Sequence, residues 1–400
     1  MKKNILLKTF SVLFIVTLLS VNLFGETIEV DYFERNTSSN QDSFSDNRLS
    51  VAAAGRGYTG TADQGDISLS LLNPAAFKVA KKYQLYFEYG TKSDIDWNEG
   101  FDEEYVDDVS IKSYKPGILF GFATQRENFS FGLIFTTKKS YDLFFKNMYI
   151  GELYDEPCYT DFPNGTSITS VVIPLSYNFK DIVTLGFTLN FDKYKSSYKH
   201  IIYHNGHFLY EGAKIDFMLV HFVFGTIITP FKNISLGVSY LPAISKDISY
   251  NYYSEYDIQH APSNYPYEFR IGLKYKTNLF PLTVYGDYKF SNYSSFASLK
   301  DRSDYHIGLE YKIFEKYIIR SGFFTQFDNR DVDYTYINDD GEDSDYWASD
   351  IDLEQYFLTF GLSCPIWRSV EINFAIMDSN LLSKSYAKQT HIKVGVGINY

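Results

Sequence analysis

The stretch QTHIKVGVGINY, residues Gln389–Tyr400, alternates between two kinds of side chain. From Ile392 to Tyr400 every second residue is large and apolar, and the residues between them are Lys, Gly, Gly and Asn. Because successive side chains of a strand point to opposite faces, this pattern predicts a β-strand with one apolar face and one polar face. The strand ends on an aromatic residue.

The same alternation recurs along most of the chain. Clear examples are Phe129–Phe135, Val183–Phe191, Ile234–Tyr240, Phe269–Tyr275 and Tyr305–Tyr311. In each of them the alternate positions are small, polar or charged. A chain built almost wholly from such strands predicts an all-β fold, a transmembrane antiparallel β-barrel whose hidden face is polar.

The composition agrees with a barrel and excludes other classes. Aromatic residues make up 18% of the chain, with 36 Tyr and 35 Phe, which suits aromatic girdles at two membrane interfaces. No segment after residue 25 has eighteen consecutive apolar residues, so helical spans are not expected. The net charge of -12 argues against nucleic acid as a partner.

The first residues predict export. Lys2, Lys3 and Lys8 precede the apolar run Phe10–Leu19, and the small residue Gly25 follows at a plausible cleavage point. The run is too short to span a bilayer, so residues 1–25 are interpreted as a signal peptide. We therefore expect a polar extension and plug segment over 26–82, a barrel over 83–400, and a location in the outer membrane of a diderm bacterium.

Turn signals and alternation divide the barrel region into fourteen strands, an even number that a closed antiparallel barrel requires. The connections alternate in length. The short ones are expected to be periplasmic turns, and the long ones extracellular loops that include 139–166, 195–213 and 243–264. The expected strands cover 83–91, 115–125, 129–138, 167–179, 182–194, 214–228, 234–242, 265–276, 281–290, 304–313, 317–327, 352–363, 369–379 and 389–400.

The segment before the first strand is rich in small residues and glycines, which cannot form a core alone but can pack tightly inside another structure. Within it, Pro74 biases Asn73 away from helix and starts a turn. Glycines also recur on the polar face of the strands. They indicate either a functional role, in which the lumen is kept open or a plug approaches the wall closely, or relief of crowding in tilted strands. The residues that define the segment are Gly55, Gly57, Thr59, Gly60, Ala62, Gly65, Asp66, Asn73, Pro74 and Ala75.

This series resembles the N-terminal plug of the FadL/TodX family, outer-membrane transporters of long-chain fatty acids and other hydrophobic compounds. The resemblance implies a barrel occluded by an N-terminal hatch, with substrate captured outside and released sideways into the membrane. The implied partners are outer-membrane lipids and a hydrophobic small molecule. The oligomeric state is left open, and the resemblance supports the fold more firmly than the cargo.

Charged residues on the polar face are candidate contacts for the carboxylate head group of a substrate, since Arg and Lys bind carboxylates well. They are Arg270, Lys274, Arg320 and Lys393. The alternative is that such charges pair with one another or solvate the lumen.

The sequence gives little support for a metal site, a disulfide or an enzyme active site. His200, His204 and His207 fall in an expected loop, where converging metal ligands are not guaranteed, and the acidic block at 328–352 fits no EF-hand spacing. Cys158 and Cys364 are expected at opposite ends of the barrel, too far apart for a disulfide. No enzyme motif occurs, so we expect no catalytic residue, no metal and no cofactor.

The leading functional prediction is passive uptake of hydrophobic small molecules such as long-chain fatty acids. Two alternatives stay open: a porin for polar solutes, and a barrel that serves as a scaffold or secretion partner without transport. A porin should conduct ions steadily, whereas a scaffold should co-purify with protein partners.

Overall fold

The computed structural model of the chain describes residues 50–79, 82–96, 108–112, 116–153, 156–204, 207–252, 258–294, 299–314, 316–329, 335–337, 343–345, 354–384 and 388–400. The expected signal peptide (1–25) and most of the polar extension that follows it lie outside these residues.

Fourteen antiparallel strands pair in a closed ring, which confirms the predicted fold class and strand number. The ring closes where β1 pairs with β20, with Gln84 opposite Asn399 and Lys92 opposite His391. The wall strands are β1 (Tyr83–Lys92), β4 (Gly117–Arg126), β5 (Phe129–Leu153), β6 (Glu156–Phe179), β7 (Val183–His204), β8 (His207–Phe231), β9 (Ile234–Leu241), β12 (Glu268–Lys276), β13 (Leu282–Ser291), β14 (Arg302–Ile313), β15 (Tyr317–Gln326), β18 (Gln355–Trp367), β19 (Val370–Asp378) and β20 (Thr390–Asn399).

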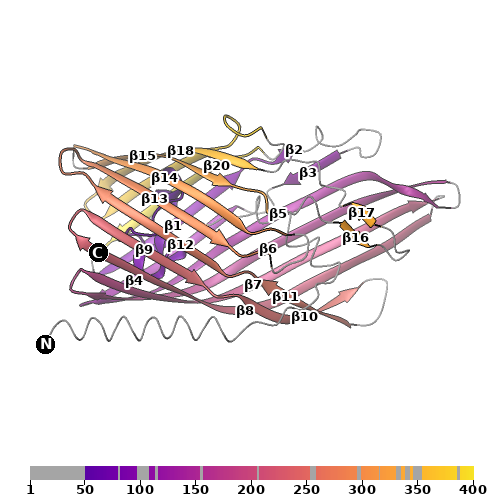
Figure 1. Cartoon of the computed structure of the whole chain (residues 1–400), viewed down its shortest axis with the longest axis horizontal. Helices are drawn as coiled ribbons and strands as arrows, with labels where there is room; N and C mark the ends of the chain where they lie inside the picture. The colour runs from indigo at the N-terminus through magenta and orange to yellow at the C-terminus, as the bar shows by residue number, and fades with distance from the viewer. Residues whose placement is uncertain are drawn as a thin grey trace.

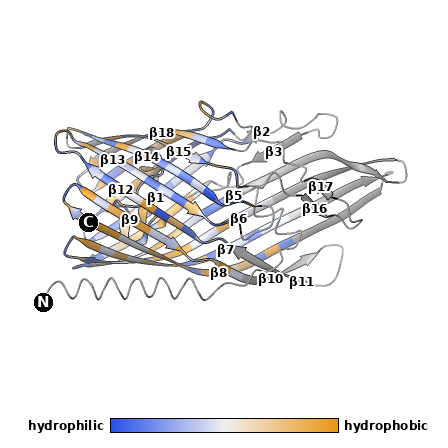
Figure 2. Cartoon of the chain, viewed as in Figure 1, coloured by the Kyte–Doolittle hydropathy of each residue, from blue (hydrophilic) through white to orange (hydrophobic). Residues whose placement is uncertain are grey.

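The two faces of the wall differ as the alternation predicts, and Figure 2 shows hydrophobic and hydrophilic residues interleaved along the strands. On β14 the apolar side chains of Tyr305, Ile307 and Leu309 are exposed on the outside, while Asp304 and His306 are buried inside. An outer band of exposed Phe, Tyr, Leu, Ile and Val is costly in water and favourable in lipid. The strands therefore present the barrel to a bilayer.

Four strands are much longer than a membrane crossing needs. β5 to β8 have 25, 24, 22 and 25 residues, whereas about 9–11 residues span a bilayer. Figure 1 shows them running far beyond the other strands, away from the end where the C-terminus lies. We call this far end the long-loop end, and the end with the short connections the turn end.

The expected loops at 139–166, 195–213 and 243–264 are therefore wrong for most of their length. The first two are continuations of β5 to β8, and the third holds β10 (Ile244–Tyr252) and β11 (Ile258–Tyr265), which pair with each other. The clean apolar alternation ends where strands leave lipid, but the Tyr, Ile, Phe and Thr content still favours pairing. His200 and His204 accordingly lie on β7 and His207 on β8, not in a loop.

Smaller elements complete the long-loop end. They are β2 (Ile95–Asp96), β3 (Asp108–Lys112), which pairs with β5, and the isolated hairpin of β16 (Thr335–Ile337) and β17 (Asp343–Asp345). Cys364 on β18 is a free cysteine near the turn end, whereas Cys158 lies at the start of β6 at the far end.

Residues 50–79, called the inner segment below, lie inside the turn-end half of the barrel, where Figure 1 shows them as the indigo chain. The segment contains the helix α4 (Val51–Gly55) and the 3-10 helices η1 (Ile67–Leu71) and η2 (Pro74–Ala76). Among the described residues, no helix is both long enough and apolar enough to cross a membrane.

Candidate functional site: the inner segment and its seat in the barrel

Local capping bonds shape the inner segment, which is too short and too rich in Gly and Ala to fold by burial alone. Ser50 caps α4 by accepting from the backbone N–H of Ala53 at 3.2 Å. Asp66 Oδ1 caps η1 at the N–H of Ser68, and Asn73 Oδ1 caps η2 at the N–H of Ala75, both at 2.9 Å. The Asn73-Pro74 step therefore makes the turn that its sequence predicts.

The wall approaches the inner segment through glycines. A Cβ on Gly186 would lie 2.1 Å from the backbone N of Ala75, and one on Gly237 would lie 2.1 Å from the carbonyl O of Thr61. Such distances leave no room for any side chain. Ten of the fourteen wall strands bring a glycine against the inner segment in this way: Gly121, Gly132, Gly186, Gly225, Gly237, Gly272, Gly308, Gly322, Gly361 and Gly395.

This contact extends around the circumference of the lumen. The glycines lie on β4, β5, β7, β8, β9, β12, β14, β15, β18 and β20, on all sides of the ring. Of the two interpretations of the recurrent glycines, close approach of the N-terminal residues to the wall is the one that the geometry supports.

Wall side chains satisfy the exposed backbone of the inner segment. Asp287 Oδ2 on β13 accepts from the N–H groups of Gly60 and Thr61, each at 2.9 Å, and from Thr61 Oγ1 at 2.7 Å. Glu88 Oε1 on β1 accepts from the N–H of Val51 at 2.7 Å. Irregular backbone inside a barrel needs such partners, because unpaired buried amides are costly.

Asn73 does the same from the segment side. Its Nδ2 donates to the carbonyl O of Thr61 at 2.6 Å and to that of Thr226 on β8 at 3.3 Å. One fully buried side chain thereby joins two parts of the segment and the wall.

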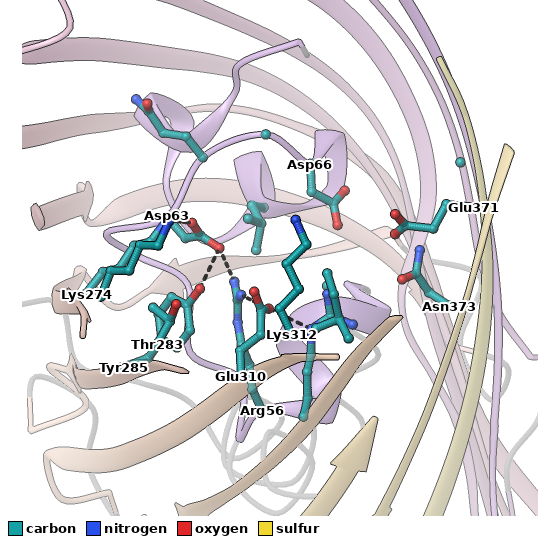
Figure 3. A pocket seen from close by; sticks show the side chains of 18 of the residues that line it. Arg56, Asp63, Asp66, Lys274, Thr283, Tyr285, Glu310, Lys312, Glu371 and Asn373 are labelled. Carbon is teal, nitrogen blue, oxygen red and sulfur yellow. Dashed lines mark hydrogen bonds and ion pairs between the residues drawn. The ribbon is translucent and has the colours of Figure 1, made fainter. Parts of the chain in front are cut away.

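An ion-pair cluster fixes the centre of the segment. Arg56, only 2% exposed, donates to Asp63 at 2.6 Å and to Glu310 on β14 at 3.0 Å, and its guanidinium lies 4.1 Å from the ring centroid of Tyr285. Lys274 on β12 reaches Asp63 at 2.5 Å. Figure 3 shows Arg56 and Asp63 from the segment facing Lys274, Tyr285 and Glu310 from the wall.

The electrostatics of this cluster follow from its composition. Burial by itself raises the pKa of a carboxyl, but the charges of Arg56 and Lys274 hold the pKa of Asp63 well below its usual range. Asp66 has no such close cation, and burial raises its pKa despite the bonds from Ser68. Asp63 is thus a fixed charge that binds the segment to β12.

A cavity of about 500 Å³ lies between the segment and the turn end. Its lining includes the charged cluster and, nearer the opening, Lys276, Lys312 and Glu371. The lining also includes apolar side chains, among them Leu69 and Ile318, so charged and apolar surfaces meet in this space.

The structure gathers the predicted plug residues in one place. Gly57 has φ +73°, Gly60 +150° and Gly65 +110°, conformations that favour glycine. Thr59 Oγ1 donates to the carbonyl O of Arg56 at 2.8 Å. Gly55 packs on Gly361 of β18, where an added Cβ would lie 2.7 Å from Cα.

Of the four candidate head-group contacts, Lys274 and Arg320 line the same cavity, whereas Arg270 and Lys393 are not in its lining. Lys274 pairs with Asp63, Lys393 on β20 bonds to the hydroxyl of Tyr58, and Arg320 on β15 pairs with Glu310 at 2.9 Å. Three of the four thus position the inner segment or its anchor. Arg270 lies buried on β12, two residues from Gly272 towards the long-loop end.

Sequence reasoning missed the residues that hold the segment, above all Arg56, Asp63 and Asp287. The available signal was a lone Arg between two glycines of the motif, followed by an Asp, in a segment expected to be buried. A buried cation requires an acidic partner, which directs attention to the acidic residues on the polar faces of the strands.

The fold and this site define a class: a fourteen-stranded transmembrane barrel, of the outer-membrane type, with an N-terminal segment seated in its lumen. Neither the protein-family models nor the curated sequences gave a match to the chain.

Solved structures do match. A Pseudomonas aeruginosa FadL homologue aligns with a TM-score of 0.66 at 12% identity, over 88% of this chain and 98% of the other. The Ralstonia pickettii toluene transporter TbuX gives 0.63 at 13%, over 88% and 98%. The Pseudomonas putida toluene transporter TodX gives 0.56 at 12%, over 88% and 96%.

These likenesses confirm the resemblance to the FadL/TodX family at the level of the fold. The chain has the fold of FadL-type outer-membrane channels. Two of the three neighbours are described as toluene transporters.

Proposed function

We propose that this protein is an outer-membrane channel for passive uptake of hydrophobic small molecules with an acidic head group, long-chain fatty acids among them, and that the inner segment is its plug. Substrate enters at the long-loop end, which faces the outside because short turns of such barrels face the periplasm. The fold shared with two toluene transporters supports hydrophobic cargo as a class.

The observation that carries the proposal is the fit of the inner segment to the wall. Ten strands bring glycines against it, and buried ion pairs tie it to β12 and β14. An open porin does not need such a seat. A segment that fills the lumen at one level blocks polar solutes, which leaves a role in controlled passage.

Basic side chains in the lumen, on the long-loop side of the segment, support the proposal that the substrate has an anionic head group. Arg270, Lys289 and Arg302 on β12, β13 and β14 are all buried there, and the charge of Lys139 on β5 acts on the last two across the lumen. The acidic side chains beside them are Glu268, 3.2 Å from Lys289, Asp304, 2.8 Å from Arg302, and Asp287, which interacts electrostatically with Arg270. Four basic side chains against three acidic ones leave one basic group in excess, which attracts a carboxylate.

Uptake measurements test the proposal. Cells that carry this barrel as their only channel for such compounds should accumulate a labelled long-chain fatty acid and exclude a labelled disaccharide. The porin alternative predicts the reverse, and the scaffold alternative predicts uptake of neither. Either result contradicts the proposal.

The head-group role of Arg270 has its own test. Arg270→Gln should lower the uptake of fatty acid roughly tenfold, since a charge-assisted bond contributes about 1.5–3 kcal/mol, while uptake of an uncharged aromatic hydrocarbon stays unchanged. Lys214→Gln, at an exposed lysine of β8 far from this region, is the matched control. An equal loss of uptake for both compounds would show that Arg270 does not recognise the head group.

A further inference from the structure

The turn end of the barrel has a charge opposite to that of the whole chain. The six short connections and their flanking strand ends (126–128, 180–182, 230–233, 276–281, 312–316 and 367–369) contain seven basic and three acidic residues, in a chain of net charge -12. Eighteen of the 49 acidic residues are concentrated in the blocks 94–108 and 328–352, which follow the opposite ends of the strands. The short turns therefore carry a net positive charge, opposite in sign to that of the chain.

Each of the six turns carries an exposed cation. None of the six forms an ion pair within the part of the chain that the structure describes. One sits at or beside each turn: Arg126, Lys180, Lys232, Lys276, Lys316 and Arg368.

Five of the same turns also carry large apolar side chains that nothing in the described structure covers. Leu279 is 88% exposed, Phe314 85% and Trp367 71%, and Phe314 is held there with φ +48°. Phe231 and Ile182 occupy the corresponding places in two other turns. A ring of such side chains in water is unfavourable, so a partner surface with an apolar layer is expected to receive it.

The position of the turns indicates that this partner is lipid. Outward-facing tyrosines mark the membrane interface one to three residues from three of these cations: Tyr177, Tyr275 and Tyr317. At about 3.3 Å per residue the cations lie within roughly 10 Å of the girdle, which is the depth of the lipid head groups.

We infer that the turn end is a binding collar for anionic phospholipids of the periplasmic leaflet, in which turn cations bind phosphate head groups and the apolar turn residues insert among the acyl chains. Cations combined with aromatic and aliphatic side chains at one depth are the arrangement that recognises negatively charged lipid surfaces. Anionic lipid is favoured over zwitterionic lipid because the turns hold seven basic residues against three acidic ones, which leaves an excess of positive charge. The inference does not depend on the cargo.

Trp367 gives a direct probe, because it ends β18 at the turn end and the chain has only two other Trp, Trp97 and Trp347. The full-length protein carrying Trp97→Phe and Trp347→Phe is reconstituted in equal mixtures of phosphatidylglycerol and phosphatidylcholine, with bromine on the acyl chains of one lipid at a time. Brominated phosphatidylglycerol should quench Trp367 at least about twofold more than brominated phosphatidylcholine, and about 1 M salt should remove the difference.

Charge removal locates the effect. The triple variant Arg126→Gln, Lys316→Gln and Arg368→Gln changes the turn beside Trp367 and the nearest turn on either side of it, and it should abolish the preference. The control triple Lys214→Gln, Lys384→Gln and Lys388→Gln removes three exposed lysines at the long-loop end and should keep it. Equal quenching by both lipids in the unaltered collar, or a preference that survives the turn triple, would overturn the inference.

Discussion

Arg56 shows how a single side chain positions the inner segment. A guanidinium taken out of water costs several kcal/mol, and its attraction to two carboxylates returns roughly that amount when the geometry is good. The net gain in stability is small, but the pairing has only one satisfactory arrangement. Asp63, Glu310 and Tyr285 surround the guanidinium from three directions. Arg56 therefore determines the position of the segment in the lumen more than it increases the stability of the folded protein.

Loss of this cation should loosen the segment while the barrel survives. Arg56→Gln leaves two buried carboxylates with fewer partners, and breaking such a pair costs about 3–5 kcal/mol. Hydrogen exchange of residues 50–77 should accelerate, whereas exchange in β13 and β14 should change little. The double variant Arg56→Gln, Asp63→Asn should lose less protection than the single variant. Equal loss in both would show that Arg56 and Asp63 do not act as a pair.

Glycine positions offer a sharper contrast. In Gly186→Ala the new methyl group meets the backbone of Pro74 and Ala75 at 2.1 Å, so the segment must shift, at a cost of roughly 1–3 kcal/mol. Gly286→Ala is the matched control, since its methyl group would have nothing within 4 Å and should change stability by less than about 0.5 kcal/mol. Hydrogen exchange of the inner segment measures the effect of each variant. Similar effects at the two positions would contradict the close packing of the segment against Gly186.

At the scale of elements, the strand register decides which residues meet lipid. Leu309 on β14 is 43% exposed on the outer face, and the next residue, Glu310, points inward to Arg56. Leu309→Arg should cost roughly 2–4 kcal/mol at mid-membrane and impair assembly, whereas Glu310→Gln should leave assembly intact and only loosen the inner segment. Heat-modifiable migration on a gel measures assembled barrel. Equal assembly of the two variants would show that this strand register, with Leu309 facing lipid and Glu310 facing the lumen, is wrong.

The strands were predictable because each carries its own signal. Alternation of apolar residues is local, and it persists for as long as the strand crosses lipid, so all fourteen wall strands could be located. The extensions of β5 to β8 could not, since strands outside the membrane have no lipid-facing side to keep the alternation. Pairing there depends on neighbouring strands, which a local pattern does not contain.

The inner segment was predictable in composition but not in its contacts. Small residues and the Asn73-Pro74 step indicate a chain that fits inside something and turns once. The wall partners of Arg56 and of the Gly60-Thr61 amides lie more than 200 residues away on β13 and β14. These residues come together only when the barrel closes around the segment. The ion-pair cluster could therefore not be predicted from any local stretch of sequence.

At the scale of the whole molecule, the barrel is a closed wall with a shaped insert, and the central claim is that the insert blocks the lumen. Deletion of residues 49–76 tests this most directly, with single-channel conductance in planar bilayers as the measurement. Heat-modifiable migration first establishes that the shortened protein is correctly assembled. We predict that the intact protein is nearly silent and that the deletion variant conducts ions steadily and passes small polar solutes. Equal conductance of the two proteins would contradict the account.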